Sequence, residues 1–167
     1  MKSQRRKPVN ATAIRLLVLD VDGVMTDGRL HYGARGEALK VFHVRDGLGI
    51  RAVMQAGIEV AVISGRSSTM VARRCRDLGI KHLIQGKDDK LPVLERLLRR
   101  LKLAAAQCAC IGDDIVDVPL LKVAGIAFAV ADAHPSACRA AHKVTRLSGG
   151  RGAVREVCDH LLAARTR

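Results

Sequence analysis

Short apolar runs alternate with longer amphipathic segments along most of the chain. Runs such as IRLLVL at 14–19 and IEVAVIS at 58–64 are typical of strands that are buried on both faces. The segments between them repeat apolar residues at helical spacing, and two of them end at Gly57 and Gly79, as helices often do. The predicted strands are 14–19, 58–64, 81–84, 108–114, 126–130 and 143–145. The predicted helices are 45–57, 67–79, 88–103, 115–125, 134–142 and 152–165.

This alternation predicts an α/β fold in which helices cover both faces of a parallel sheet. One segment departs from the alternation. Residues 29–43 have short alternating arms around the turn Gly33–Gly36, which is typical of a β-hairpin. The length fits one domain, which we expect to span residues 14–164 after a basic disordered tail at 1–13.

The charge of the chain first suggests nucleic-acid binding, because its 167 residues carry a formal net charge of +13. Six of the basic residues lie in the two ends, however, and without them 23 basic residues face 16 acidic ones. Aromatic residues, on which the bases of single strands stack, make up only 2% of the chain. A basic surface also suits a small anionic substrate, so nucleic-acid binding is kept as an alternative only.

The pattern of apolar residues favours a cytoplasmic location. No apolar run approaches the roughly 20 residues that a membrane-spanning helix needs. The basic N-terminus lacks the apolar stretch of a secretory signal, while its charge alone allows a mitochondrial presequence. The five cysteines have no zinc-ligand spacing, and we expect them to be buried thiols in a reducing compartment.

Polar residues gather where the predicted strands end, and parallel sheets bind their ligands at that edge. The first strand runs into Asp20 and Asp22, and buried carboxylates are costly unless they are paired or bound to a metal. The other polar residues expected at this edge are Ser64, Arg66, Lys90, Asp113, Asp114 and Asp117. Hard oxygen ligands without a histidine or cysteine cluster favour Mg²⁺ over Zn²⁺. The pattern therefore predicts a magnesium site.

Rival motifs fit less well. A calcium-binding EF-hand loop that began at Asp20 would need glycine at 25 and glutamate at 31, where the chain has Met25 and His31. The GxxxxGK[ST] loop of nucleotide-binding proteins does not occur in the sequence. GLGIRA at 47–52 matches a dinucleotide-binding glycine pattern, but SGR stands where the acidic residue of that motif is expected. Dinucleotide binding is therefore not favoured.

Four motifs in order, DVDGV, ISGR, DDKL and IGDDIVD, resemble those of the haloacid dehalogenase superfamily of phosphatases. The resemblance covers roughly residues 14–162 and includes KVFHVRDGLGI, VADAHP and SGGRGAVREV. Within the superfamily, these segments look like those of the phosphatases of 3-deoxy-D-manno-octulosonate 8-phosphate. The resemblance implies a Rossmann-like sheet of the capless haloacid dehalogenase type, with a protruding β-hairpin.

The resemblance also implies a mechanism. Asp20 would attack phosphorus and form an aspartyl-phosphate. Asp22 would protonate the leaving sugar alkoxide and then activate water. Mg²⁺ would be held by Asp20, by the backbone carbonyl of Asp22 and by Asp113, and it would screen the repulsion between nucleophile and phosphate. Ser64 would hydrogen-bond a phosphoryl oxygen, and Lys90 would offset the negative charge.

Three arginines are candidates for contacts with an anionic substrate. Arg66 follows the second predicted strand at the same edge, and Arg45 precedes a predicted helix, although either could instead form a structural ion pair. Arg151 lies in a glycine-rich piece that we expect to be flexible. Asp114 or Asp117 would orient the metal ligands, and Asp117 could equally be a solvated helix acid. The residues alone do not choose between these roles.

The spacing of the motifs leaves no room for a cap domain. There are 41 residues between Asp22 and Ser64 and 25 between Ser64 and Lys90. An open site would leave a phosphoenzyme poorly shielded from water. The hairpin at 29–43 has apolar arms, and a lone hairpin is marginal in water, so we expect it to pair with the hairpins of neighbouring subunits. The resemblance implies a homotetramer in which a neighbouring subunit completes the site.

These features predict a Mg²⁺-dependent phosphomonoesterase, a phosphoric monoester hydrolase, acting on a small anionic sugar phosphate. The resemblance implies that it hydrolyses 3-deoxy-D-manno-octulosonate 8-phosphate to the free sugar acid and phosphate in the cytoplasm, as a step of lipopolysaccharide synthesis. Neither a membrane nor a nucleic acid is expected as a partner. Two alternatives stay open: a phosphatase of a nine-carbon 2-keto-3-deoxy sugar acid phosphate, and a non-catalytic oligomerisation module.

Overall fold

The central strand is wholly apolar because helices cover both of its faces. The computed structural model describes residues 10–165. In it, strand β1 (Leu16–Leu19) is fully buried. Leu17 and Leu19 point into one hydrophobic cluster, whereas Leu16 and Val18 point into a second one. Side chains alternate across a strand, so the two clusters are the two faces of the sheet.

Within the described chain, six parallel strands form one sheet in the order β5-β4-β1-β6-β7-β8. Besides β1 they are β4 (Glu59–Ile63), β5 (His82–Ile84), β6 (Cys108–Gly112), β7 (Ile126–Ala129) and β8 (Lys143–Val144). The predicted parallel α/β sheet is confirmed. Because β1 lies between β4 and β6, the three strands whose ends carry the polar motifs are direct neighbours.

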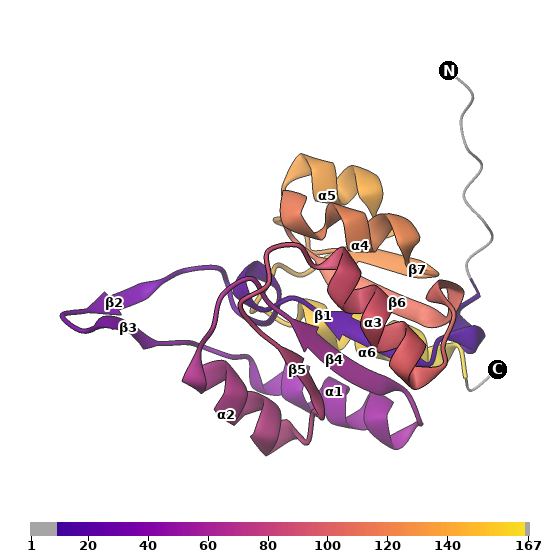
Figure 1. Cartoon of the computed structure of the whole chain (residues 1–167), viewed down its shortest axis with the longest axis horizontal. Coiled ribbons are helices and arrows are strands. Elements are labelled where there is room, and N and C mark those ends of the chain that lie inside the picture. Colours follow the sequence, from indigo (N-terminus) through magenta and orange to yellow (C-terminus); the bar gives the residue numbers. More distant parts are fainter. Residues whose placement is uncertain (1–9, 166–167) are drawn as a thin grey trace.

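Six α-helices of the described chain cover this sheet in two layers. They are α1 (Val44–Gln55), α2 (Thr69–Leu78), α3 (Leu91–Leu101), α4 (Val118–Val123), α5 (Pro135–Ala140) and α6 (Ala153–Ala163). Residues of α1, α2 and α6 fill the first cluster, and residues of α3, α4 and α5 fill the second. Figure 1 shows α4 and α5 on one side of the sheet and α1 and α2 on the other. None of these helices is long and apolar enough to cross a membrane.

Helix α6 begins without a capping side chain of its own, and α1 supplies one. Its N-cap residue is Gly152, with φ of 109°. The Arg155 backbone N–H donates to the carboxylate of Asp46 over 2.8 Å, and Asp46 is buried in the first turn of α1. A carboxylate at a helix N-terminus satisfies a free N–H group and complements the helix dipole. Asp46 therefore fixes α6 against α1.

The predicted hairpin is present and stands apart from the sheet. Strands β2 (His31–Gly33) and β3 (Gly36–Leu39) form a separate antiparallel pair. In Figure 1 this hairpin projects away from the body of the protein. Apolar side chains on and beside it are exposed, with Tyr32 at 68% and Val41 at 58%. Within the described part of the chain, these apolar side chains of the hairpin are therefore left uncovered.

Most element ends differ from the prediction by a few residues, and two differences are larger in kind. The tail was predicted to end at residue 13, but Asn10 caps a 3₁₀ turn, η1 (Ala11–Ala13), and Ala11 packs against the first cluster; residues 1–9 lie outside the described residues. The helix predicted at 115–125 is divided into a 3₁₀ turn, η4 (Ile115–Asp117), and α4. Pro119 stands at the start of α4, where its missing N–H costs no helical hydrogen bond.

Candidate active site

Three neighbouring strands deliver the candidate catalytic residues to one edge of the sheet. Asp20 follows β1, Ser64 follows β4 and Asp113 follows β6. Leu19 pairs with Val62 of β4 and with Ile111 of β6, so the three strands end at nearly the same level. A cavity of about 210 Å³ opens at this edge. It is lined by Asp20, Asp22, Ser64, Gly65, Arg66, Asp88, Lys90, Asp113, Asp114 and Val116.

A buried ammonium lies between two buried carboxylates at the floor of the site. Lys90 Nζ donates to Asp20 Oδ1 over 2.6 Å and to Asp117 Oδ1 over 2.7 Å, and all three residues are buried. Burial alone would lower the pKa of Lys90, but the two carboxylates raise it above its usual value. Burial and the neighbouring Asp117 raise the pKa of Asp20 to about 6, against the opposing effect of Lys90. Lys90 therefore holds the carboxylates of Asp20 and Asp117 close together.

Asp113 faces this cluster, and no residue of the described part of the chain forms a salt bridge with it. Burial, together with repulsion from Asp20, Asp117 and Asp114, raises the pKa of Asp113 to about 8. Carboxylate oxygens of Asp20, Asp113 and Asp117 all lie within 4.8 Å of one another. Such a set of hard oxygen donors fits a divalent cation of the Mg²⁺ type, which would remove the repulsion.

Gly23 makes room for this carboxylate. Its φ is 89°, in the left-handed region that favours glycine. A Cβ at this position would come within 2.0 Å of Asp113 Oδ2. The glycine of the DVDGV motif is therefore required both by the backbone turn after Asp22 and by the space that Asp113 occupies.

The two remaining acids of the IGDDIVD motif have different places. Asp117 is 2% exposed, and its Oδ2 accepts the backbone N–H groups of Asp113 (3.0 Å) and Asp114 (3.3 Å), while its Oδ1 faces Lys90. Asp114 is exposed and caps the turn by accepting the N–H of Ile115 over 2.7 Å. Asp117 is therefore not a solvated helix acid. Its two oxygens hold Lys90 and the backbone that carries Asp113.

Asp22 lies at the rim, in a separate charged network. Lys40 Nζ donates to Asp22 Oδ1 over 2.5 Å and lies 2.8 Å from Glu37 Oε1. Arg66 Nε is 3.8 Å from Asp22 Oδ2, and Arg66 Nη2 is 3.4 Å from Glu37 Oε2. Glu37 lies in β3 and Lys40 directly follows it. The network therefore joins the base of the hairpin to the catalytic edge.

Comparison with known proteins agrees with this geometry. Residues 82–156 match the model of the haloacid dehalogenase-like hydrolases. The chain is 53% identical over 92% of its length, and 82% of the relative, to 3-deoxy-D-manno-octulosonate 8-phosphate phosphatase KdsC of Escherichia coli K12. The chain belongs to the haloacid dehalogenase-like hydrolase family. It is a hydrolase of the phosphatase type.

Solved structures of similar hydrolases have the same fold. One is the Moraxella catarrhalis 3-deoxy-D-manno-octulosonate 8-phosphate phosphatase in complex with magnesium, phosphate and KDO: it is 43% identical, with a TM-score of 0.92 over 94% of this chain and 90% of that one. Another is the cobalt-bound phosphatase YrbI of Haemophilus influenzae, which is 48% identical with a TM-score of 0.92 over 94% and 92% of the two chains. These two relatives thus each hold a divalent metal ion.

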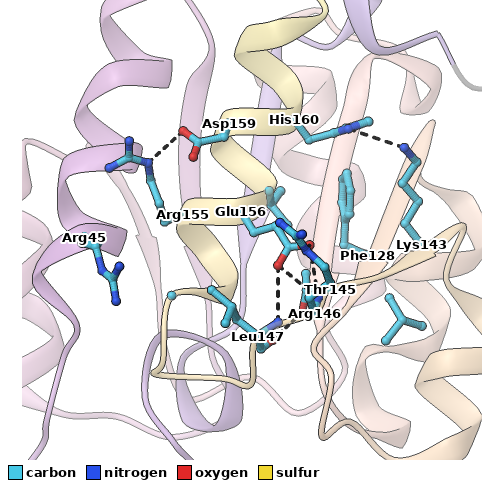
Figure 2. A pocket seen from close by; sticks show the side chains of 13 residues that line it. Arg45, Phe128, Lys143, Thr145, Arg146, Leu147, Arg155, Glu156, Asp159 and His160 are labelled. Carbon is cyan, nitrogen blue, oxygen red and sulfur yellow. Dashed lines mark hydrogen bonds and ion pairs between the residues drawn. The ribbon is translucent and has the colours of Figure 1, made fainter.

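Two of the three candidate arginines do not line the catalytic cavity. Only Arg66 does. Arg45, on the first turn of α1, lines a second cavity of about 510 Å³ beside β8 and α6 (Figure 2). Arg151 is 63% exposed and lies 3.6 Å from Asp27. A substrate contact by Arg45 or Arg151 within the same subunit therefore finds no support in their position.

The glycine-rich piece around Arg151 is packed, which corrects the expectation that it is flexible. The Gly150 N–H donates to the Val24 carbonyl over 2.9 Å. A Cβ on Gly149 would come within 1.7 Å of the Gly23 carbonyl oxygen. These glycines permit a close approach of two backbones, and the segment supports the loop that carries Asp22.

Sequence reasoning missed Lys40. Its side chain is 2% exposed although it adjoins an exposed hairpin, and it contacts a catalytic candidate 18 positions earlier in the chain. The one signal was a lysine at the end of the second apolar hairpin arm, followed at once by the apolar pair Val41–Phe42. That signal does not say which carboxylate the lysine meets.

Proposed function

We propose that the protein is a Mg²⁺-dependent phosphomonoesterase that hydrolyses 3-deoxy-D-manno-octulosonate 8-phosphate through an aspartyl-phosphate. The main support is the arrangement of Asp20, Lys90, Asp117 and Asp113 around one point, in a chain 53% identical to a protein of that name. A fixed carboxylate beside a cation site is what in-line attack on an anionic phosphate requires.

In the first step, an oxygen of Asp20 attacks phosphorus while the ester bond to the sugar oxygen breaks. Lys90 holds the carboxylate in place and offsets charge as the phosphoryl group approaches. Asp22 gives its proton to the departing alkoxide, so that the products of this step are the free sugar acid and a phosphorylated Asp20. Ser64, buried at the cavity wall, donates its hydroxyl to a phosphoryl oxygen.

In the second step, water attacks phosphorus and Asp22 accepts its proton. The bond between phosphorus and the Asp20 oxygen breaks, which releases phosphate and restores the carboxylate. Mg²⁺, when bound by Asp20, Asp113 and the Asp22 carbonyl, supplies Lewis-acid charge that lowers the repulsion between carboxylate and phosphate. Asp117 keeps Asp113 oriented through the backbone N–H bond at 3.0 Å.

Substrate recognition is proposed to begin with Arg66. It lines the cavity, is 39% exposed and has its guanidinium near the carboxylate that protonates the leaving group. A guanidinium suits bidentate binding of the sugar carboxylate. Arg151 and Arg45 remain candidates only for the site of a neighbouring subunit, because neither lines the cavity of its own chain.

We further propose a homotetramer in the cytoplasm, acting in lipopolysaccharide synthesis. The exposed apolar hairpin supports the assembly, since Leu30, Tyr32 and Leu39 have 45%, 68% and 45% of their surface exposed. Light scattering that found an active monomer would contradict this part and leave the chemistry untouched.

The experiment that tests the function is phosphate release with Mg²⁺ from four substrates: the eight-carbon acid phosphate, its nine-carbon analogue, a hexose phosphate and a nucleotide. We expect a large preference for the eight-carbon acid and loss of activity in Asp20→Asn. Asp77→Asn, an exposed carboxylate of α2, is the matched control and should behave as the wild type. Turnover of the nine-carbon acid instead would keep the mechanism and reject the substrate. No turnover by a folded oligomer would reject both.

A further inference from the structure

The side chain of Lys40 is shielded from solvent although the residue follows a partly exposed strand. Its side chain is 2% exposed, and its ammonium lies between Asp22 and Glu37. Burial would lower the pKa of Lys40, but these two carboxylates raise it above its usual value, so the ammonium stays charged. A buried charge that is fixed by two partners holds one geometry more firmly than an exposed ion pair does.

Lys40 is not part of the cavity wall. The described residues that line the cavity include Asp22 and Arg66 but not Lys40. Lys40 therefore reaches the reacting atoms only through the carboxylate that it binds. This placement separates it from Lys90, which lines the cavity and bonds directly to the nucleophile.

The contact is made with one particular oxygen of Asp22. Lys40 Nζ donates to Oδ1 over 2.5 Å, and Oδ2 lies 3.8 Å from Arg66 Nε on the cavity side. Lys40 therefore holds the Asp22 carboxylate by one oxygen and leaves Oδ2 beside Arg66, a residue of the cavity wall.

We propose that Lys40 is a positioning residue for the general acid and base: anchored by Glu37 at the base of the hairpin, it fixes the rotamer of Asp22 and so orients the carboxylate toward the cavity. This inference rests on the proposed phosphatase function and extends it to a residue outside the four motifs. Its consequence is that the hairpin contributes to catalysis within its own subunit, in addition to any contact with neighbours.

The test compares Lys40→Met with Lys40→Arg and with the double variant Glu37→Gln/Lys40→Met. In Lys40→Met we expect kcat for the sugar phosphate to fall about 10- to 100-fold, part of what general acid–base catalysis contributes. KM should stay within about threefold, because the substrate contacts remain. Lys40→Arg keeps a cation at this place and should recover part of the loss. Lys122→Met, on the exposed side of α4, is the matched control for the loss of a charge.

The double variant separates positioning from mere structural support. Lys40→Met leaves the half-buried Glu37 with Arg66, 3.4 Å from its Oε2, as its remaining cation, so the variant should lose stability, and Glu37→Gln removes the carboxylate charge that Lys40 had balanced. We expect the double variant to recover its melting temperature while kcat stays low. Recovery of both together would overturn the proposal, because the lysine would then serve only the hairpin.

A second assay uses p-nitrophenyl phosphate, whose leaving group needs no proton. Rapid mixing should show a burst of about one nitrophenolate per site in Lys40→Met, followed by slow turnover, because the second step still needs Asp22 as a base. Equal loss in burst rate and in sugar-phosphate turnover would contradict the proposal. If the wild type instead hydrolyses a different alkyl phosphate among the four substrates named above, the same variants are assayed with that ester. If it hydrolyses neither alkyl nor aryl phosphates, the proposed function and this inference both fail.

Discussion

Replacing Asp113 by asparagine should stabilise the metal-free protein, although the residue is a proposed metal ligand. Asp113 is half-buried beside Asp20, Asp117 and Asp114, and its pKa rises from the usual 3.8 to about 8. A carboxyl whose pKa is higher in the folded than in the unfolded state binds more protons when folded. Loss of this proton therefore lowers the free energy of unfolding progressively as the pH rises from about 4 to 8.

The size of the effect follows from the shift. At 1.36 kcal/mol per pH unit, a rise from 3.8 to about 8 sets an upper limit of about 6 kcal/mol at pH 8.5. Because Asp113 is only half-buried, solvent reduces both the burial penalty and the repulsion from the neighbouring carboxylates. We expect the charge on Asp113 to lower the free energy of unfolding by about 2–3 kcal/mol. Asparagine keeps the shape of the side chain and removes the charge, so Asp113→Asn should recover that amount at pH 8.5 and little at pH 4.5.

Urea denaturation in EDTA at pH 4.5, 7 and 8.5 measures this difference directly. Asp77→Asn, which removes an exposed carboxylate far from the site, should change the free energy of unfolding by less than about 0.5 kcal/mol. Repeating the series with millimolar Mg²⁺ should stabilise the wild type at pH 8.5 and leave Asp113→Asn nearly unchanged. An asparagine variant that is less stable than the wild type in EDTA at pH 8.5, or that gains as much from Mg²⁺, would refute this reasoning.

Three further changes test other parts of the structure. Lys90→Met leaves Asp20 and Asp117 without their shared cation, so the free energy of unfolding near pH 7 should fall by about 3–5 kcal/mol in urea titrations, and an unchanged midpoint would contradict the buried triad. Asp46→Ala removes the acceptor at the start of α6 and should cost about 1–2 kcal/mol by the same measurement, with hydrogen exchange increased first in that helix. Tyr32→Asp places a charge on the exposed hairpin face and should reduce the mass in light scattering to that of a smaller assembly, whereas an unchanged mass would remove the hairpin from the interface.

The sheet and the first catalytic residues could be predicted because their signals are local. An apolar strand that ends in Asp20, and another that ends in Ser64, fix both the strand and its carboxyl end. Parallel strands then bring these ends together without further information. The sequence did not show which of Asp114 and Asp117 faces the site. This depends on a 3₁₀ turn that points Asp117 inward and leaves Asp114 exposed.

The expectation for the glycine-rich segment was wrong for a physical reason. Gly149 and Gly150 were expected to be flexible, but they are glycine because the Gly23–Asp27 backbone passes too close for a Cβ. A sequence does not distinguish a glycine that needs freedom from one that needs space. Arg45 was a candidate for a substrate contact or a structural ion pair; α1 packs against α6 and places Arg45 at the wall of the cavity beside β8 (Figure 2). The carboxyl ends of the strands indicate the edge of the sheet at which a ligand binds, but they do not indicate on which side a helix presents its first turn.

The position of Lys90 at the site could be predicted from the sequence, whereas that of Lys40 could not. Lys90 lies in a motif directly before α3, so its place relative to Asp20 follows from the order of strands and helices. Lys40 reaches Asp22 only because the chain leaves the sheet, turns back through the hairpin and returns beside the catalytic loop. If the hairpin serves Asp22 as well as any subunit contact, its sequence is constrained at its base by charge and along its arms by apolar surface. Changes at Lys40 should then alter kcat without altering mass, and changes at Tyr32 should alter mass before they alter chemistry.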